Sequence, residues 1–395
     1  MHPGRLRQHD QLTAAIAVLR LAGRERSVLG LPRGPLRLRR AWPRRSGRLL
    51  LEYWAADGRI IGGQWLADPR RLGEVAEETR RSGPAELVEA AVGHRVLLQS
   101  AGADRRLPGL APLLAQPGST LLVHRPEQRA VVRLAGSPAP AYARVVPPSR
   151  LEPLVGAVDR ARGMADGAFT TPVLREVDRG SGVGVFESLP GAPLHELLGS
   201  DEALSQAPAI GRALRTLHAA DVRPETEPHG PDAEARVLWM WVGRLPRYAA
   251  SLARPTSEAA AGVADALHPE RPVPLTPAHR DLHDKQIFLD GGPSVGLLDF
   301  DTLAAAEPAL DLANLLVHLE LRAMQGDCDA GWARRMAEGV LDGYGRDSYR
   351  EDRLSAYADA TRVRLACVYA FRPRWSGVSE ALLARVGANV PGTGG

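Results

Sequence analysis

The sequence predicts an α+β protein in which a β-rich first part precedes a mainly helical second part. Runs of aliphatic and β-branched residues separated by turn signals recur up to residue 189. Beyond that point, apolar residues recur at three- and four-residue spacing, which is typical of helices. The chain has 395 residues, of which 44% are hydrophobic and 24% are charged. This length fits about two or three globular domains.

Composition also excludes several classes of protein. No run reaches the roughly 18 uninterrupted apolar residues that a membrane helix needs. The apolar stretch 13–19 ends at Arg20 without the small-residue cleavage site of a signal peptide. Cys328 and Cys367 are the only cysteines, too few for a disulfide framework and without the paired spacing of a metal site. We therefore expect a cytoplasmic protein that does not associate with membranes.

Residues 1–48 are strongly basic, with twelve arginines against Asp10 and Glu25. This segment has a net charge of +10, so the remainder of the chain carries −6 of the total of +4. Proteins that bind single-stranded nucleic acid interleave cations with stacking aromatic residues, and the segment lacks that pattern. We expect a basic, partly disordered arm, and nucleic acid is disfavoured as a partner.

Residues 49–118 are expected to form a small α+β accessory or cap domain. Residues 49–66 alternate in apolar character around the Asp57-Gly58 turn, which predicts a β-hairpin. A helix over 70–83, a strand over 92–99 and a short helix over 104–116 should follow, the last one broken by prolines. No chemistry is recognisable in this segment.

Residues 119–189 are expected to form a five-stranded antiparallel sheet with one inserted helix. The predicted strands are 119–124, 129–134, 141–146, 170–177 and 182–189, and the helix is 151–162. The glycines at 180, 182 and 184 belong to a hairpin turn, because no strand-to-helix transition surrounds them. Residues 190–390 should be mainly helical, with helices over 203–220 and 233–252.

The most informative stretch runs from His279 to Asp301. A polar loop, His279-Arg-Asp-Leu-His-Asp-Lys-Gln286, leads into a β-hairpin whose second strand ends at Asp299-Phe-Asp301. Carboxylates at a strand end, beside a loop with another carboxylate and an amide, can converge on a hard cation through oxygen ligands. Magnesium with a phosphate is the natural occupant of such a site.

This spacing resembles the aminoglycoside phosphotransferase and choline kinase family, relatives of the protein kinases. That family has a His-x-Asp loop with an asparagine five residues after the Asp, and a metal-binding Asp after a hairpin. His279, Asp281 and Gln286 match the loop, and Asp299 matches the metal residue. Further similar segments are 189–194, 211–218 and 308–314, so the resemblance covers about residues 119–375.

The resemblance implies a bilobal protein-kinase-like fold, with an antiparallel β N-lobe, a helical C-lobe and the accessory unit in front. ATP or GTP would lie between the lobes, and the main chain of Glu187 to Leu189 would meet the base. Asp281 would accept the proton of an acceptor hydroxyl, while His279 would brace its loop. Gln286 and Asp299 would hold Mg²⁺ on the phosphates. The implied activity is phosphoryl transfer to a small-molecule hydroxyl.

Two positions depart from the family pattern. The lysine that holds the phosphates falls at Arg144, which keeps the charge but has a bulkier planar head. In the family, an acidic residue on the next helix positions this cation. Glu152 and Asp159 both lie on the predicted helix, and Asp159 is one candidate for that role. Gln286 keeps the amide oxygen of asparagine on a side chain one methylene longer. The chain has one lysine and two asparagines, so a compositional bias accounts for both exchanges.

Several alternatives stay open. Because Arg144 and Gln286 depart from the family pattern, the protein could be a pseudokinase that binds a nucleotide or a partner without turnover. His279, Asp281, His283 and Asp284 could instead bind zinc in a hydrolase, which would need ligands downstream such as His318. The acceptor is also open. An acidic cluster of Glu225, Glu227, Asp232 and Glu234 suits an aminoglycoside, whereas an N-terminal cap resembles maltokinase-like sugar kinases, and an amino alcohol is a third class. Oligomeric state is not indicated.

Overall fold

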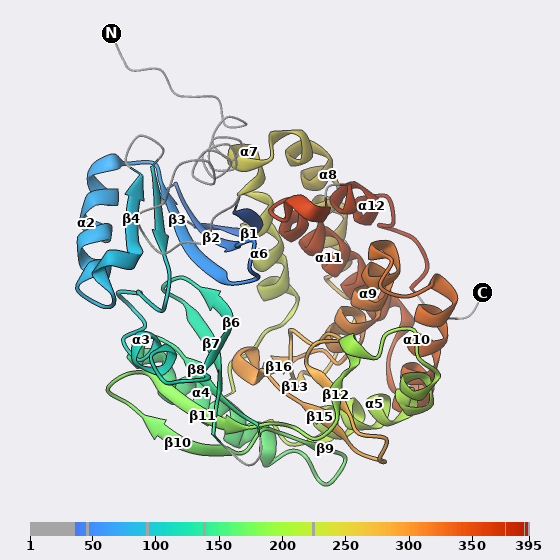
Figure 1. Cartoon of the computed structure of the whole chain (residues 1–395). Coiled ribbons are helices and arrows are strands. Elements are labelled where there is room, and N and C mark those ends of the chain that lie inside the picture. The colour runs from blue at the N-terminus through green and yellow to red at the C-terminus, as the bar shows by residue number, and fades with distance from the viewer. Residues whose placement is uncertain are drawn as a thin grey trace.

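The computed structural model describes residues 36–44, 47–91, 95–136, 140–222, 226–375, 377–390 and 392–393. Two antiparallel sheets lie one above the other on one side of the molecule, and the helices of the second half of the chain form the other side (Figure 1). Within the described residues, no helix is long and apolar enough to cross a membrane.

The first sheet belongs to the front of the chain and has the strand order β1-β2-β3-β5-β4. Its strands are β1 (Arg37–Arg44), β2 (Arg48–Trp54), β3 (Ile60–Leu66), β4 (Val88–Ala91) and β5 (Val96–Gln99). Helix α2 (Pro69–Arg80) covers it, with Leu72, Val75 and Ala76 packed into a small apolar core. The Asp68 side chain accepts a hydrogen bond from Arg70 N at 2.9 Å and so caps the start of this helix.

Strand β1 lies inside the segment expected to be a basic arm. Arg39 and Arg40 on this strand pair with the fully buried Glu52 of β2, at 3.0 and 2.9 Å. A buried counter-charge therefore turns two arginines of the arm into part of the sheet. Residues 1–35 lie outside the described part of the chain. The predicted hairpin of 49–66 is confirmed. Of the expected short helix 104–116, only Leu110–Leu114 (α3) is helical; Pro108 precedes it, whereas Pro112 lies in its first turn.

The second sheet has the strand order β10-β11-β8-β7-β6 and confirms the predicted five-stranded arrangement. Its strands are β6 (Thr120–Arg125), β7 (Arg129–Leu134), β8 (Ala141–Val145), β10 (Leu174–Asp178) and β11 (Val183–Glu187). Helix α4 (Leu151–Arg162) packs Leu151, Leu154 and Val158 against Val146 and Phe186. The glycines at 180–184 form the turn and start of the β10–β11 hairpin, as predicted.

The second half of the chain is helical around the buried helix α9. The helices are α5 (Asp201–Ala219), α6 (Pro231–Val242), α7 (Leu245–Tyr248), α8 (Ala250–Ala266), α9 (Ala309–Gln325), α10 (Ala330–Tyr344), α11 (Glu351–Tyr369) and α12 (Val378–Leu383). The single helix expected over 233–252 is wrong: the chain leaves the helical conformation after Val242, where Gly243 follows, and again at Ala249.

Short strands carry the polar loop of residues 279–286. Strand β13 (Thr276–Ala278) pairs with β16 (Ala304–Ala306), and β14 (Ile287–Leu289) pairs with β15 (Val295–Leu297), so the predicted hairpin is confirmed. Strand β12 (Ala192–Pro193) extends this small sheet at β14, and β9 (Phe169–Thr170) extends it at β15. The loop therefore begins and ends on anchored strands.

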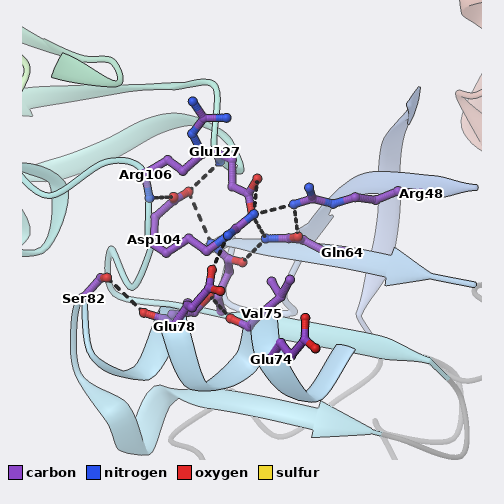
Figure 2. A network of polar contacts seen from close by, with 12 residues as sticks. Arg48, Gln64, Glu74, Val75, Glu78, Ser82, Asp104, Arg106 and Glu127 are labelled. Carbon is purple, nitrogen blue, oxygen red and sulfur yellow. Dashed lines mark hydrogen bonds and ion pairs between the residues drawn. The ribbon is translucent and has the colours of Figure 1, made fainter. Parts of the chain in front are cut away.

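The front sheet contacts both other parts of the molecule. Ala41 N of β1 donates a hydrogen bond of 2.9 Å to Phe371 O of the helical part. On the other side, side chains of β2 and β3 reach Glu127 in the turn between β6 and β7 through polar contacts (Figure 2). The front unit thus bridges the two lobes.

Candidate active site

Asp311 of helix α9 holds the polar loop in place. Its carboxylate, which is fully buried, accepts hydrogen bonds from His279 N and Arg280 N, both at 2.6 Å. It also lies 3.1 Å from His218 Nε2 of α5. Arg280 has a left-handed backbone (φ 68°), a conformation that costs about 1–3 kcal/mol for a residue with a side chain. The two short hydrogen bonds offset that cost, so Asp311 anchors the loop.

His279 braces the same loop. Its Nε2 lies 2.9 Å from Leu298 O, and Asp281 N donates to its Nδ1 at 3.4 Å. The ring also packs against Phe300, with 4.7 Å between ring centroids. Because both nitrogens contact the main chain, His279 positions Asp281, and these contacts support the bracing role over that of a base.

Asp299 lies at the end of the hairpin among two arginines of the second sheet. Its carboxylate is 3.1 Å from Arg129 Nη1 and 3.3 Å from Arg144 Nη2, and Arg144 Nη2 also lies 2.6 Å from Asp301. Burial alone would raise the pKa of Asp299, but Arg144 and Arg129 hold it well below its usual range. The carboxylate is therefore ionised and able to bind cations at neutral pH. The sequence reasoning missed Arg129, which carries no local signal.

Gln286 presents an amide oxygen for which the described residues offer no partner. Gln286 is buried, and its Oε1 makes no hydrogen bond there. Such an acceptor is costly to leave unpaired, and an amide oxygen is a suitable ligand for a hard cation. Gln286 and Asp299 therefore fit the expected Mg²⁺.

The zinc alternative lacks a ligand set. Within the described part of the chain, no three His, Cys, Asp or Glu side chains gather as metal ligands. His318 Nδ1 lies 2.7 Å from Asn314 O, and its ring packs beside that of His283, with 5.0 Å between centroids. Burial lowers the pKa of both histidines. His318 is thus a core residue next to the loop.

The prediction that Asp159 of helix α4 positions Arg144 is wrong. The Asp159 carboxylate is exposed and lies 3.8 Å from Arg162 of the same helix, while Glu152 pairs with Arg179 at 2.6 Å. The described ion pairs of Arg144 go instead to Asp299 and Asp301. Helix periodicity explains this outcome, because Val158 is buried against the sheet and the next residue points about 100° away.

Glu187 and Leu189 lie at the link between the lobes. The carboxylate of Glu187 pairs with Arg175 at 2.7 Å, and its backbone N donates to Val173 O at 2.9 Å. Leu189 is 6% exposed, and its carbonyl accepts a hydrogen bond from Ser188 Oγ at 3.0 Å. The contact of this segment with a nucleotide base stays a prediction.

Two carboxylates of the acidic cluster expected to attract an aminoglycoside lie beside histidines. Glu234 is buried, and its Oε2 lies 2.7 Å from His229 Nε2. Asp232 lies 2.8 Å from His268, whose hydrogen bond and charge lower the pKa of the Asp232 carboxyl. Glu225 lies outside the described residues. Two of the four carboxylates therefore already have partners.

Glu127 is a further residue that sequence reasoning missed. It lies in the turn between β6 and β7, has a left-handed backbone (φ 59°) and is 3% exposed. Arg105 Nε and Nη2 donate to its two oxygens at 2.7 and 3.2 Å, and Gln64 Nε2 donates at 3.2 Å. Asp104 accepts a hydrogen bond from Glu127 N at 2.7 Å (Figure 2). The front unit thus fixes the turn that precedes Arg129.

Together, the bilobal arrangement, the anchored His279–Gln286 loop and Asp299 define a protein-kinase-like phosphotransferase fold. A model of the phosphotransferase enzyme family (APH) matches residues 118–354. Because the match covers more than half of the chain, the protein belongs to this family. The family resemblance and the kinase-like fold predicted from the sequence are both confirmed. No curated protein sequence matches the chain.

Several solved structures match the chain at low sequence identity. Amicoumacin kinase in complex with AMP-PNP, Ca²⁺ and Ami is 18% identical, with a TM-score of 0.50 over 69% of this chain and 87% of that one. A spectinomycin phosphotransferase in complex with ADP and spectinomycin is 10% identical (TM-score 0.49, 68% and 88%). A choline/ethanolamine kinase family protein from Mesorhizobium loti is 18% identical (TM-score 0.47, 70% and 90%). At such identities, the likeness concerns the fold.

Proposed function

We propose that the protein transfers the γ-phosphoryl group of ATP or GTP to a hydroxyl of a small molecule. The observation that carries the proposal is the loop of Asp281, which Asp311 and His279 hold beside an ionised Asp299 and an unpaired amide oxygen of Gln286. A proton acceptor and two oxygen ligands for a cation are the groups that phosphoryl transfer needs from a protein. The amicoumacin kinase with AMP-PNP and Ca²⁺ supports a nucleotide with a divalent metal.

Each group has a role in this proposal. Gln286 and Asp299 would hold Mg²⁺, which offsets the negative charge of the phosphates. Arg144 would contact the phosphates in place of the family lysine, with Arg129 beside it. The main chain of Glu187 to Leu189 would meet the base. Asp159, which is exposed and pairs with Arg162, has no place in the nucleotide site.

Asp281 would act on the acceptor. Its carboxylate orients the hydroxyl and takes its proton as the new O–P bond forms. The bond between the γ-phosphorus and the β,γ-bridging oxygen breaks, and its electron pair leaves with the nucleoside diphosphate. Arg129 and Arg144 would stabilise the charge on the transferred group.

A second candidate function is nucleotide binding without turnover. The ion pairs of Arg129 and Arg144 with Asp299 favour this alternative, because a metal ion and two guanidinium groups compete for one carboxylate. In an active enzyme, nucleotide phosphates would draw the arginines away from Asp299. In a pseudokinase, the arginines would stay.

The test begins with calorimetric titration of ATP and GTP, with and without Mg²⁺, into the wild type and Asp299→Ala. Magnesium-dependent binding that Asp299→Ala abolishes would support the nucleotide site. Folded protein that binds neither nucleotide would refute the proposal.

Turnover is then tested with the wild type, Asp281→Asn and the control Asp290→Asn, which changes an exposed aspartate of the β14–β15 turn. We expect transfer to acceptors in the wild type and the control, and its loss in Asp281→Asn with nucleotide binding kept. Nucleotide binding without transfer to any acceptor would instead favour the pseudokinase.

A further inference from the structure

A large basic cavity lies between the front unit and the helical part of the molecule. It has a volume of about 1020 Å³, at the upper end of the range of small-molecule sites. Three of its arginines, Arg37, Arg39 and Arg40, come from strand β1. Four more cations come from the helical part: Lys285, Arg322, Arg372 and Arg374. The front unit therefore supplies nearly half of the charge.

The cavity has far more positive than negative charge. Among the lining residues that the structure describes, Asp327 is the one carboxylate. Behind the lining, Glu52 pairs with Arg39 and Arg40, and Asp284 pairs with Arg322. Together with Asp327, these described carboxylates offset three of the seven positive charges. Within the described part of the chain, no carboxylate lies within 4.0 Å of the charged groups of Arg37, Lys285, Arg372 or Arg374. Such an excess favours the binding of an anion.

The cations of the cavity lie close enough to repel one another. Desolvation lowers the pKa of Arg372, and Arg40 and Arg322 lower it further. An anion in the cavity would relieve this repulsion.

Aromatic side chains lie against three of the guanidinium groups. Arg39 stacks over Trp54 at 4.6 Å, Arg372 over Tyr369 at 4.3 Å and Arg374 over Trp375 at 4.8 Å from the ring centroid. Stacking leaves the N–H edges of a guanidinium free for hydrogen bonds. These edges suit the oxygens of a phosphate or carboxylate group.

The cavity is built onto the catalytic loop. Lys285 follows Asp281 by four residues, and the buried Asp284 between them accepts two hydrogen bonds from Arg322, at 2.9 and 3.0 Å. Asp284 also lies 2.6 Å from Nδ1 of His195, another lining residue. The loop that presents Asp281 therefore also orients Arg322 and His195 of the cavity. Arg144, Glu187, Leu189 and Asp299, to which we assign the nucleotide, do not line it.

We propose that this cavity binds an anionic group of the acceptor, a phosphate or a carboxylate, so that the substrate is an acidic alcohol such as a sugar phosphate or a hydroxy acid. That the bound anion is the phosphoryl acceptor rests on the proposed function, whereas the binding of an anion to the cavity does not. The cations would repel an aminoglycoside or an amino alcohol. A neutral sugar would leave the excess charge without a partner.

Binding tests this proposal without turnover. Glucose 6-phosphate, citrate, glucose and kanamycin are titrated into the wild type by calorimetry, with and without Mg²⁺ and ADP, at two salt concentrations. We expect binding of glucose 6-phosphate, citrate or both, weakened by salt, and no binding of glucose or kanamycin. The two anions distinguish a phosphate site from a carboxylate site.

Variants locate the site. Arg372→Ala with Arg374→Ala should weaken anion binding at least tenfold, because two cations are lost. The matched control is Arg254→Ala with Arg334→Ala, two exposed arginines on other helices, and it should bind as the wild type does. Melting temperatures verify that both double variants fold.

Two results would overturn the proposal. Glucose could bind as tightly as glucose 6-phosphate, or the Arg372→Ala, Arg374→Ala variant could bind anions as tightly as the control variant does. If the protein binds no nucleotide, the anion-binding measurements can still be interpreted. The anion site and the kinase activity can therefore fail separately.

Discussion

The substitution Glu127→Gln tests whether the front unit holds the β6–β7 turn. The carboxylate accepts two hydrogen bonds from Arg105 and one from Gln64, and it pairs with Arg48. Breaking a buried ion pair costs about 3–5 kcal/mol. Glutamine keeps one oxygen, and Arg105 and Arg48 are partly exposed, at 17% and 21%. We therefore expect a loss of about 3 kcal/mol in the free energy of unfolding.

Thermal unfolding measures this loss. At about 2 °C or more per kcal/mol for large domains, the melting temperature should fall by about 6 °C. Burial alone would raise the pKa of Glu127, but Arg105 and Arg48 lower it below its ordinary value of 4.5. The stabilisation is therefore present above that pH and lost as the pH falls through the lowered pKa. The difference between wild type and variant should shrink in acid.

The control is Glu74→Gln, which changes an exposed glutamate of helix α2 that pairs with Arg71. Its melting temperature should stay within about 1 °C of the wild type, since surface pairs contribute little. Nucleotide affinity is measured in parallel, and it should fall in Glu127→Gln because Arg129 follows the same turn. Equal melting temperatures for the two variants would refute the reasoning.

Three further predictions concern other parts of the molecule. Asp311→Asn should lower kcat by about tenfold to a hundredfold in a transfer assay, since it weakens one of the charged hydrogen bonds that hold the loop. Gln286→Leu should abolish magnesium-dependent nucleotide binding in calorimetry without lowering the melting temperature, because it removes a buried acceptor that lacks a partner. Glu307→Gln should destabilise the protein by about 3 kcal/mol in denaturant unfolding, because it breaks the buried pair with Arg353 at 2.7 and 3.0 Å.

Each of these has an opposing result. An unchanged kcat in Asp311→Asn would show that the His279–Gln286 loop keeps its conformation without the Asp311 carboxylate. A lower melting temperature in Gln286→Leu, with metal dependence kept, would make the amide a structural group. Full stability of Glu307→Gln would mean that water replaces the lost partner.

Local patterns predicted much of the fold. Strand β7 and helix α4 have the predicted bounds, and the hairpins of β2–β3 and β14–β15 form where turn residues and alternation placed them. These elements depend on neighbours within a few residues, so the sequence alone carries the information. The prediction of one helix over 233–252 was wrong, because the chain leaves the helical conformation after Val242, where Gly243 follows.

The sequence by itself determined the order of the elements and the residues of the His279–Gln286 loop, because motif spacing and periodicity are local properties. Only the tertiary structure decided that Arg144 pairs with Asp299, that Glu127 joins the front unit to the second sheet, and that Arg37 and Arg374 line one cavity. These partners lie between 22 and 337 residues apart in the chain. No pattern within a single segment specifies such contacts, since they arise when separate elements pack and leave charges to be paired.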